Sequence, residues 1–178
     1  MKTIQVPTRE IVSIDAQLLF DQVQKRMGKV PNLYATVGYS AVALKALLTL
    51  NDILSHSKFT ATEREVISLA VSEVNNCNYC IAAHTMTGKM KGLSEEDVTA
   101  ARYGRAANPK LNTVAQLAKS IAANKGDADK DLLEDFFAAG YQASDLMELV
   151  GLIIAITFTN YVYVLTGVPI DFPQPSLV

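Results

Sequence analysis

The stretch LVGLIIAITFTNYVYVL, from Leu149 to Leu165, restricts what this chain can fold into more than any other segment, because it carries no charged side chain. It is marginal in length for a membrane-spanning helix, which needs about 20 apolar residues, and it contains Thr157, Thr159 and Asn160. A helix that is apolar on every side is typical of the centre of a domain or of a subunit interface. We therefore predict a central buried helix here and no membrane span.

Composition and charge indicate one globular domain over residues 1–178. The chain is 49% hydrophobic and 19% charged, so it has ample apolar material for a core. Its net charge is -2 and its lysines and arginines are scattered, which argues against nucleic acid or a membrane surface as a partner. The first residues, MKTIQVPTREIV, lack the apolar core of a secretory signal, and we expect a cytoplasmic protein.

Helix start and stop signals recur along the chain, whereas strand signals are nearly absent. Ser13 or Asp15 can begin the first helix, and TATERE offers a Thr-x-x-Glu capping box in two registers, from Thr60 or from Thr62. Asn76 is the expected N-cap of the helix that carries the cysteines, and Ser144 that of the last helix. The sequence predicts an all-α domain of seven or eight helices, over or near residues 16–27, 41–54, 60–72, 77–88 (with Gly88 and Gly92 marking its end), 94–104, 109–126, 128–139 and 144–167.

The segment NNCNYCIAAH, residues 75–84, holds both cysteines and one of the two histidines. On a helix Cys77, Cys80 and His84 share one face, because they are spaced three and four residues apart. With Asn76 as N-cap, both thiols lie in the first turn, where the unpaired N–H groups and the helix dipole favour a thiolate. His84 could accept the proton of Cys80 or hold its thiolate as an ion pair.

Three interpretations of this cluster stay open on spacing alone. The cysteines can be small buried hydrophobic residues, or they can bind zinc together with His84 and a fourth ligand, for which only His56 or a carboxylate remains. We favour the third, dithiol redox chemistry, in which one thiolate is oxidised to a sulfenic acid and the other condenses with it to a disulfide. A thioredoxin-type site would follow a strand, and covalent haem attachment needs a histidine where Ile81 stands.

The stretch EREVISLAVSEVNNCNYCIAAH, residues 63–84, resembles the alkylhydroperoxidase D-like, peroxidase-related branch of the carboxymuconolactone decarboxylase family. The likeness consists of Glu65, twelve positions before the first cysteine, followed by Cys-x-x-Cys-x-x-x-His. Weaker likeness at VPNLY and at TNYVYVLTGVPIDFP extends it over nearly the entire chain.

This resemblance implies an all-α homo-oligomer with cysteine-based peroxidase (peroxiredoxin) activity toward hydrogen peroxide or organic hydroperoxides. It makes Cys80 the peroxidatic cysteine and Cys77 the resolving one, with Glu65 and His84 relaying protons. An external dithiol, a protein or a lipoyl-type group, would recycle the enzyme, and no metal, haem or flavin is required. Helix position alone favours Cys77 as the more acidic thiol, whereas contact with His84 supports Cys80.

Two positions need separate predictions. By periodicity alone Glu65 reads as a solvated first-turn glutamate, beside Ser68 and Ser72, so a relay role requires that polar side to face the cysteine helix. Tyr79 stands where alkylhydroperoxidase D proper has a histidine, which removes one relay group and leaves the reductant open. Tyr79 either packs on a neighbouring helix or shapes a substrate pocket.

Two other functions are alternatives to the peroxidase. One is a redox-sensing dithiol protein that does not catalyse, and turnover with a reductant separates it from an enzyme. The other is the decarboxylase or lactone-processing chemistry of the same family. Members with that activity lack the cysteine pair, so the presence of Cys77 and Cys80 argues against it.

Overall fold

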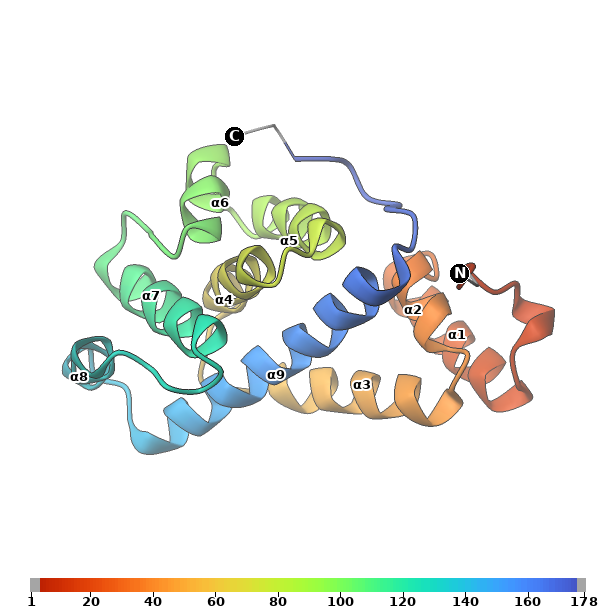
Figure 1. Ribbon diagram of the computed structural model, residues 1–178, viewed down its shortest axis with the longest axis horizontal. Coiled ribbons are helices and arrows are strands. Elements are labelled where there is room, and N and C mark those ends of the chain that lie inside the picture. Colours follow the sequence, from red (N-terminus) through yellow and green to blue (C-terminus); the bar gives the residue numbers. More distant parts are fainter. Residues whose placement is uncertain (1–3, 176–178) are drawn as a thin grey trace.

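The computed structural model describes residues 4–175, which form nine α-helices and one short 3₁₀ helix and contain no strand (Figure 1). In chain order the helices are η1 (Arg9–Ile11), α1 (Ile14–Met27), α2 (Asn32–Val37), α3 (Ala41–Leu54), α4 (Ala61–Val74), α5 (Asn78–Met90), α6 (Glu95–Arg102), α7 (Pro109–Ala123), α8 (Lys130–Ala138) and α9 (Ala143–Thr166). The predicted all-α class is confirmed. The α-helices exceed the expected seven or eight because the VPNLY segment forms a short helix of its own, α2.

Several helices start where side-chain caps predict them. The Ser13 hydroxyl accepts a hydrogen bond from the Ala16 N–H at 3.3 Å, and Asn108 caps α7 in the same way. For α4 the structure uses the first of the two possible capping boxes, in which Thr60 and Glu63 bond each other's backbone N–H groups. This choice leaves Glu65 free for contacts outside its own helix.

Two predicted helix boundaries are wrong. The last helix begins after Gln142 rather than at Ser144, because the Asp145 carboxylate accepts from the Gln142 N–H at 2.8 Å. Of the two glycines expected at the end of the cysteine helix, Gly92 follows it with a φ of 94°, whereas Gly88 lies inside it. A Cβ there would be 3.1 Å from the Leu93 side chain, so this glycine permits close packing beneath the next loop.

Helix α4 lies at the centre of one half of the molecule, where it packs against α5, α6, α7 and α9 (Figure 1). Helices α1, α2 and α3 form the other half, and α9 runs across both and contacts α2, α3, α4, α5 and α7. The largest fully buried side chains include Phe59, Phe136 and Leu149. The site described below lies where the two halves meet on α9.

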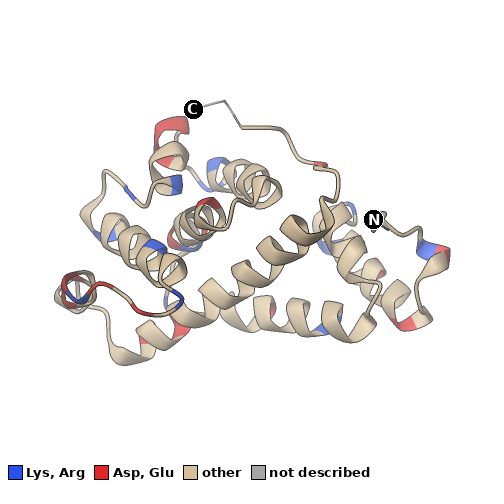
Figure 2. Ribbon diagram, viewed as in Figure 1, with Lys and Arg blue, Asp and Glu red and all other residues tan. Residues whose placement is uncertain are grey.

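Helix α9 is central, but only one side of it is buried. Figure 2 shows no charged residue along most of its length. Among the described residues, α9 is the one helix that is long enough and apolar enough to cross a membrane, by length and composition alone. Its most apolar window is 33% buried, and a core helix passes the same test, so this finding is weak support for a span. The other side exposes Ile154, Tyr161 and Leu165.

The segment after α9 contains no helix as far as residue 175, and its Ile170 and Phe172 pack against buried residues of α2 and α5. The Asn32 side chain donates to the Pro169 carbonyl at 3.0 Å, and the Lys29 ammonium lies 2.9 Å from the Asp171 carboxylate. Residues 176–178 lie outside the described residues. The C-terminal segment therefore returns the chain to the cysteine helix.

Candidate active site

The cysteine helix begins one residue later than predicted. Asn76 has a φ of 54°, which places it in the left-handed region and prevents it from acting as the N-cap. Cys77 is the N-cap instead, and its sulfur accepts a hydrogen bond from the Cys80 N–H at 3.2 Å. The two cysteines are therefore close together at the start of α5, but only Cys80 lies in the first helical turn.

Neither cysteine forms a disulfide, and both are buried, Cys77 completely and Cys80 with 3% of its surface exposed. The Cys80 thiol is within 3.7 Å of the Thr159 hydroxyl. A hydrogen bond from Cys77 lowers the pKa of Cys80, and the positive charge of His84 lowers it further, so that it falls to about 7 against the opposing effect of burial. The same bond to Cys80, followed by burial, raises the pKa of Cys77. Cys80 is thus the thiol that ionises first.

Glu65 and His84, expected from the family resemblance to act together, are in direct contact. The Glu65 carboxylate lies 2.7 Å from His84 Nδ1, and only 6% of the Glu65 surface is exposed. The same carboxylate accepts a 2.7 Å bond from the Thr87 hydroxyl and pairs with the Lys91 ammonium. The prediction of a solvated glutamate from periodicity alone is wrong, because α5 packs over this side of α4.

The charges of this cluster are fixed by one another. Burial raises the pKa of Glu65, but His84, Lys91 and Thr87 outweigh it and lower that pKa to about 2. Burial lowers the pKa of His84, but the charge of Glu65, its hydrogen bond and then Cys80 outweigh it and raise that pKa. Because Glu65 holds Nδ1, His84 keeps Nε2 as its second proton-carrying atom.

A polar network on α9 supports the thiols, although nothing in the sequence predictions assigned it a role. Asn160 is completely buried, donates to the Ser72 hydroxyl at 3.2 Å and accepts from the Asn75 amide at 2.9 Å. Hydrogen bonding to Asn160 also lowers the pKa of Cys80. The signal for it was present, since a polar residue inside an apolar helix needs a buried partner.

Tyr79, between the two cysteines, both packs and lines the site. Its hydroxyl donates to the Asp171 carboxylate at 2.6 Å and accepts from the Leu33 N–H at 3.2 Å. Its ring meets Phe172 edge to face, at 5.4 Å between centroids. Burial, followed by the bond to Asp171, raises the pKa of Tyr79, so its phenol stays protonated and does not replace a histidine as a proton acceptor.

A cavity of about 360 Å³ leads to Cys80 from between α1, α2, α3, α4, α5 and α9. Cys80, His84, Glu65 and Tyr79 line it, whereas Cys77 does not. A cavity of this size is in the range that binds small organic molecules. The peroxidatic role assigned to Cys80 therefore falls on the thiol that a substrate can reach.

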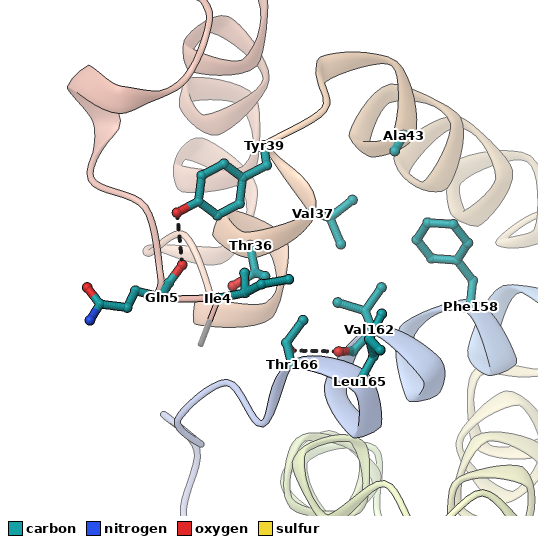
Figure 3. A pocket seen from close by; sticks show the side chains of 10 residues that line it. All are labelled: Ile4, Gln5, Thr36, Val37, Tyr39, Ala43, Phe158, Val162, Leu165 and Thr166. Carbon is teal, nitrogen blue, oxygen red and sulfur yellow. Dashed lines mark hydrogen bonds between the residues drawn. The ribbon is translucent and has the colours of Figure 1, made fainter. Parts of the chain in front are cut away.

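A second cavity, of about 590 Å³, lies between the N-terminal segment, α2, the start of α3 and the end of α9 (Figure 3). Ten residues line it: Ile4, Gln5, Thr36, Val37, Tyr39, Ala43, Phe158, Val162, Leu165 and Thr166. The Tyr39 hydroxyl donates to the Gln5 carbonyl at 3.1 Å (Figure 3). No thiol, histidine or carboxylate faces this cavity, so we place the chemistry in the smaller one.

The zinc interpretation lacks a ligand set in the part of the chain that the structure describes. No group of three or more histidine, cysteine, aspartate or glutamate side chains is arranged there to hold a metal ion. His84, which would have been the third ligand, is held by Glu65. The arrangement is that of an activated thiol with a second thiol beside it and a protonated imidazole nearby.

Fold and site together define a helical dithiol protein in which a buried Glu–His pair accompanies a Cys-x-x-Cys helix start. Residues 41–121 match the model of the carboxymuconolactone decarboxylase family. The alkyl hydroperoxide reductase AhpD of Rhodococcus erythropolis is 33% identical over 103 residues, which are 56% of this chain and 53% of that protein. The match thus spans about half the length of this curated relative.

Solved structures share the fold over nearly the whole chain. A peroxidase-related protein from Ralstonia eutropha JMP134 superposes with a TM-score of 0.82 at 20% identity, over 93% of this chain and 90% of that one. The debrominase Bmp8 superposes with a TM-score of 0.80 at 16% identity, over 96% and 93%. The sequence match to the carboxymuconolactone decarboxylase family thus covers residues 41–121, and the solved structures show that the chain shares their helical fold.

Proposed function

We propose that the protein is a thiol-dependent peroxidase that reduces hydrogen peroxide or organic hydroperoxides through Cys80. The observation that carries the proposal is that Cys80 has a lowered pKa, lines the cavity and lies next to a thiol whose pKa is raised. A thiolate, not a thiol, is the nucleophile, so the reactive atom is the one at the cavity wall.

In the first step the Cys80 thiolate attacks the terminal oxygen of the hydroperoxide. The O–O bond breaks, the sulfur is oxidised to a sulfenic acid, and the alkoxide leaves as an alcohol with a proton from His84. Glu65 holds the imidazole and stabilises its charged form, which sets up that proton transfer. Burial of the site keeps the sulfenic acid away from bulk water.

In the second step the Cys77 thiol attacks the Cys80 sulfur. An S–S bond forms, and water leaves with the hydroxyl of the sulfenic acid and one proton. The disulfide is then reduced by thiol exchange with an external dithiol, which is itself oxidised. One hydroperoxide and one dithiol thus give an alcohol, water and one new disulfide in each cycle.

The test is peroxide consumption with dithiothreitol as the reductant. The native protein should turn over many times, Cys80→Ser should fall to the background rate, and Cys77→Ser should accumulate a sulfenic acid at Cys80 that dimedone traps. Intact mass after one equivalent of peroxide should show the loss of two hydrogens from each native chain. Full activity in Cys80→Ser would overturn the assignment, and a single oxidation without cycling would identify a redox sensor.

Reductive debromination is a second candidate, because a dithiol also supplies two electrons to a carbon–bromine bond and the fold neighbour Bmp8 is a debrominase. A solved structure of its C82A variant holds 2,3,4-tribromopyrrole. Supplying that compound in place of the peroxide, with the same reductant, separates the two activities. Release of bromide at a rate well above that of peroxide reduction would favour the debrominase.

We also infer that the protein is a homo-oligomer that pairs two copies through the exposed side of α9. This side presents apolar residues at helical spacings of three and four, and contiguous apolar surface on a soluble domain marks an interface. The residues are Met147, Val150, Ile154, Phe158, Tyr161 and Leu165. Light scattering of native protein and of Ile154→Glu should show an oligomer and a smaller species, respectively, and a native monomer would refute the inference.

A further inference from the structure

The cavity that leads to Cys80 has a second end, and the rise of α9 between the two ends gives the distance that separates them. Thr159, on α9, contacts the Cys80 thiol, whereas Leu152 lines the same cavity seven residues earlier. At 1.5 Å per residue these two positions are about 10 Å apart along the helix. Next to Leu152, a Cβ on Gly151 would lie 3.1 Å from Leu54, so this second end of the cavity meets the last turn of α3.

Helix α4 gives an independent measure of the same length. Ser72 contacts Asn160 beside the thiols, and Arg64 lines the cavity two turns earlier in α4. Eight residues correspond to about 12 Å along the helix axis. Arg64 therefore lies at the end of the cavity remote from Cys80, where Asn51 and Ser55 of the last turns of α3 also line it.

Arg64 lacks a carboxylate partner. Its guanidinium donates to the Phe59 carbonyl, and it forms no ion pair within residues 4–175. Three of the other arginines pair with Asp21, Asp52 and Glu73, and the fourth lies over the Tyr103 ring. A half-buried guanidinium with free N–H groups that faces a cavity is suited to a carboxylate or a phosphate, which it binds through two parallel hydrogen bonds.

The wall between the two ends is largely apolar. Its side chains come from α1, α3, α5 and α9: Val23, Leu48, Leu54, Met86, Leu152, Ala155 and Ile156. Such a wall binds hydrocarbon by burial of apolar surface. The negative charge of Glu65 does not repel an anion at Arg64, because His84 and Lys91 both pair with that carboxylate.

We propose that the preferred substrate is an amphipathic hydroperoxide with an acidic head group, namely a hydroperoxy acid whose carboxylate binds Arg64 while its hydroperoxide meets Cys80. This proposal rests on the peroxidase function proposed above. The two groups of the substrate should be about 10 Å apart, the length of the cavity along α9. Arg26, which also lines the cavity, pairs with Asp52, so Arg64 is the arginine of this cavity that remains for the anion.

The experiment compares kcat/KM for the ω-hydroperoxide of decanoic acid with that for its methyl ester, using dithiothreitol as the reductant. The native protein should prefer the acid, and Arg64→Gln should reduce the ratio of acid to ester by about 10-fold to 100-fold, the contribution of one charge-assisted pair. Arg64→Lys should restore part of the preference. Arg105→Gln, which removes an arginine outside the cavity, should keep it.

A second measurement needs no variant and therefore no assumption that Arg64→Gln folds. Decanoate should inhibit the native protein in competition with a neutral hydroperoxide, and decanol should inhibit it much less. Equal rates with acid and ester, or equal inhibition by decanoate and decanol, would overturn the substrate proposal while leaving the peroxidase intact. Absence of turnover with every hydroperoxide would instead overturn the proposed function.

Discussion

Replacement of His84 by glutamine tests how the site activates its thiol. The imidazolium of His84 lies one helical turn from Cys80 and lowers the pKa of that thiol. Glutamine keeps a polar side chain of similar length and removes the charge. We predict that His84→Gln raises the pKa of Cys80 and slows the reaction with peroxide at neutral pH.

The size of the effect follows from the spacing. Side chains four residues apart on a helix are about 6 Å apart, and at an effective dielectric constant of about 20 two unit charges at this distance interact by about 3 kcal/mol. His84 is partly exposed to solvent, and the substitution also removes the cost of burying its charge. Together these effects reduce the interaction energy to about half, which corresponds to a shift of about one unit in the pKa of Cys80. The pKa of Cys80 should therefore rise from about 7 to about 8.

The assay is the pH dependence of alkylation at Cys80 by iodoacetamide, followed by peptide mass. Cys77 contributes little signal, since it is fully buried and its pKa is raised. His56→Gln is the matched control, because His56 is the only other histidine of the chain and lies exposed after α3. An alkylation midpoint in His84→Gln equal to that of the native protein would refute the electrostatic account.

Three further outcomes follow from the same contacts. Peroxide consumption should rise with pH through about 7 and level off above it, because the fraction of Cys80 present as thiolate does so; a rate that falls over this range would contradict the role of the thiolate. Ionised Glu65 should contribute up to about 3 kcal/mol to the free energy of unfolding above pH 4.5, lost as the pH falls toward 2, so in urea titrations Glu65→Gln should flatten this acid limb. Asn160→Ala should lower the free energy of unfolding by about 1–3 kcal/mol, since it leaves the half-buried amide of Asn75 and the buried hydroxyl of Ser72 unpaired; a change within the error of the urea titration would contradict that network.

Features that depend on neighbouring residues could be predicted from the sequence. The caps at Ser13 and Thr60 need only a hydroxyl at the right offset, so local chemistry decides them. The start of the cysteine helix was misplaced because asparagine is a far commoner cap than cysteine. The left-handed conformation of Asn76, which ends the turn after α4, moved the cap to Cys77.

Features that depend on packing between distant helices could be predicted only in part. The periodicity of α4 does not show that α5 covers Glu65, and only the family resemblance pointed to its pairing with His84. Lys91 and Asp171 gave no local signal, because each reaches the site from a segment whose position is set by the whole fold. Thr159 was noted only as a polar residue in an apolar run, and its contact with Cys80 needed the third dimension.

The hydrogen bond between the two thiols also orders the two steps of the proposed reaction. While Cys80 is a thiolate, its charge and its bond to Cys77 raise the pKa of Cys77, which keeps the second thiol protonated and unreactive. Oxidation of Cys80 to a sulfenic acid removes that thiolate, so its hydrogen bond and its charge no longer raise the pKa of Cys77 when a resolving thiolate is needed, and burial is the cause that remains. The nearby imidazole, which has given its proton to the alcohol, can then accept the proton of Cys77. The first oxidation therefore activates the second thiol.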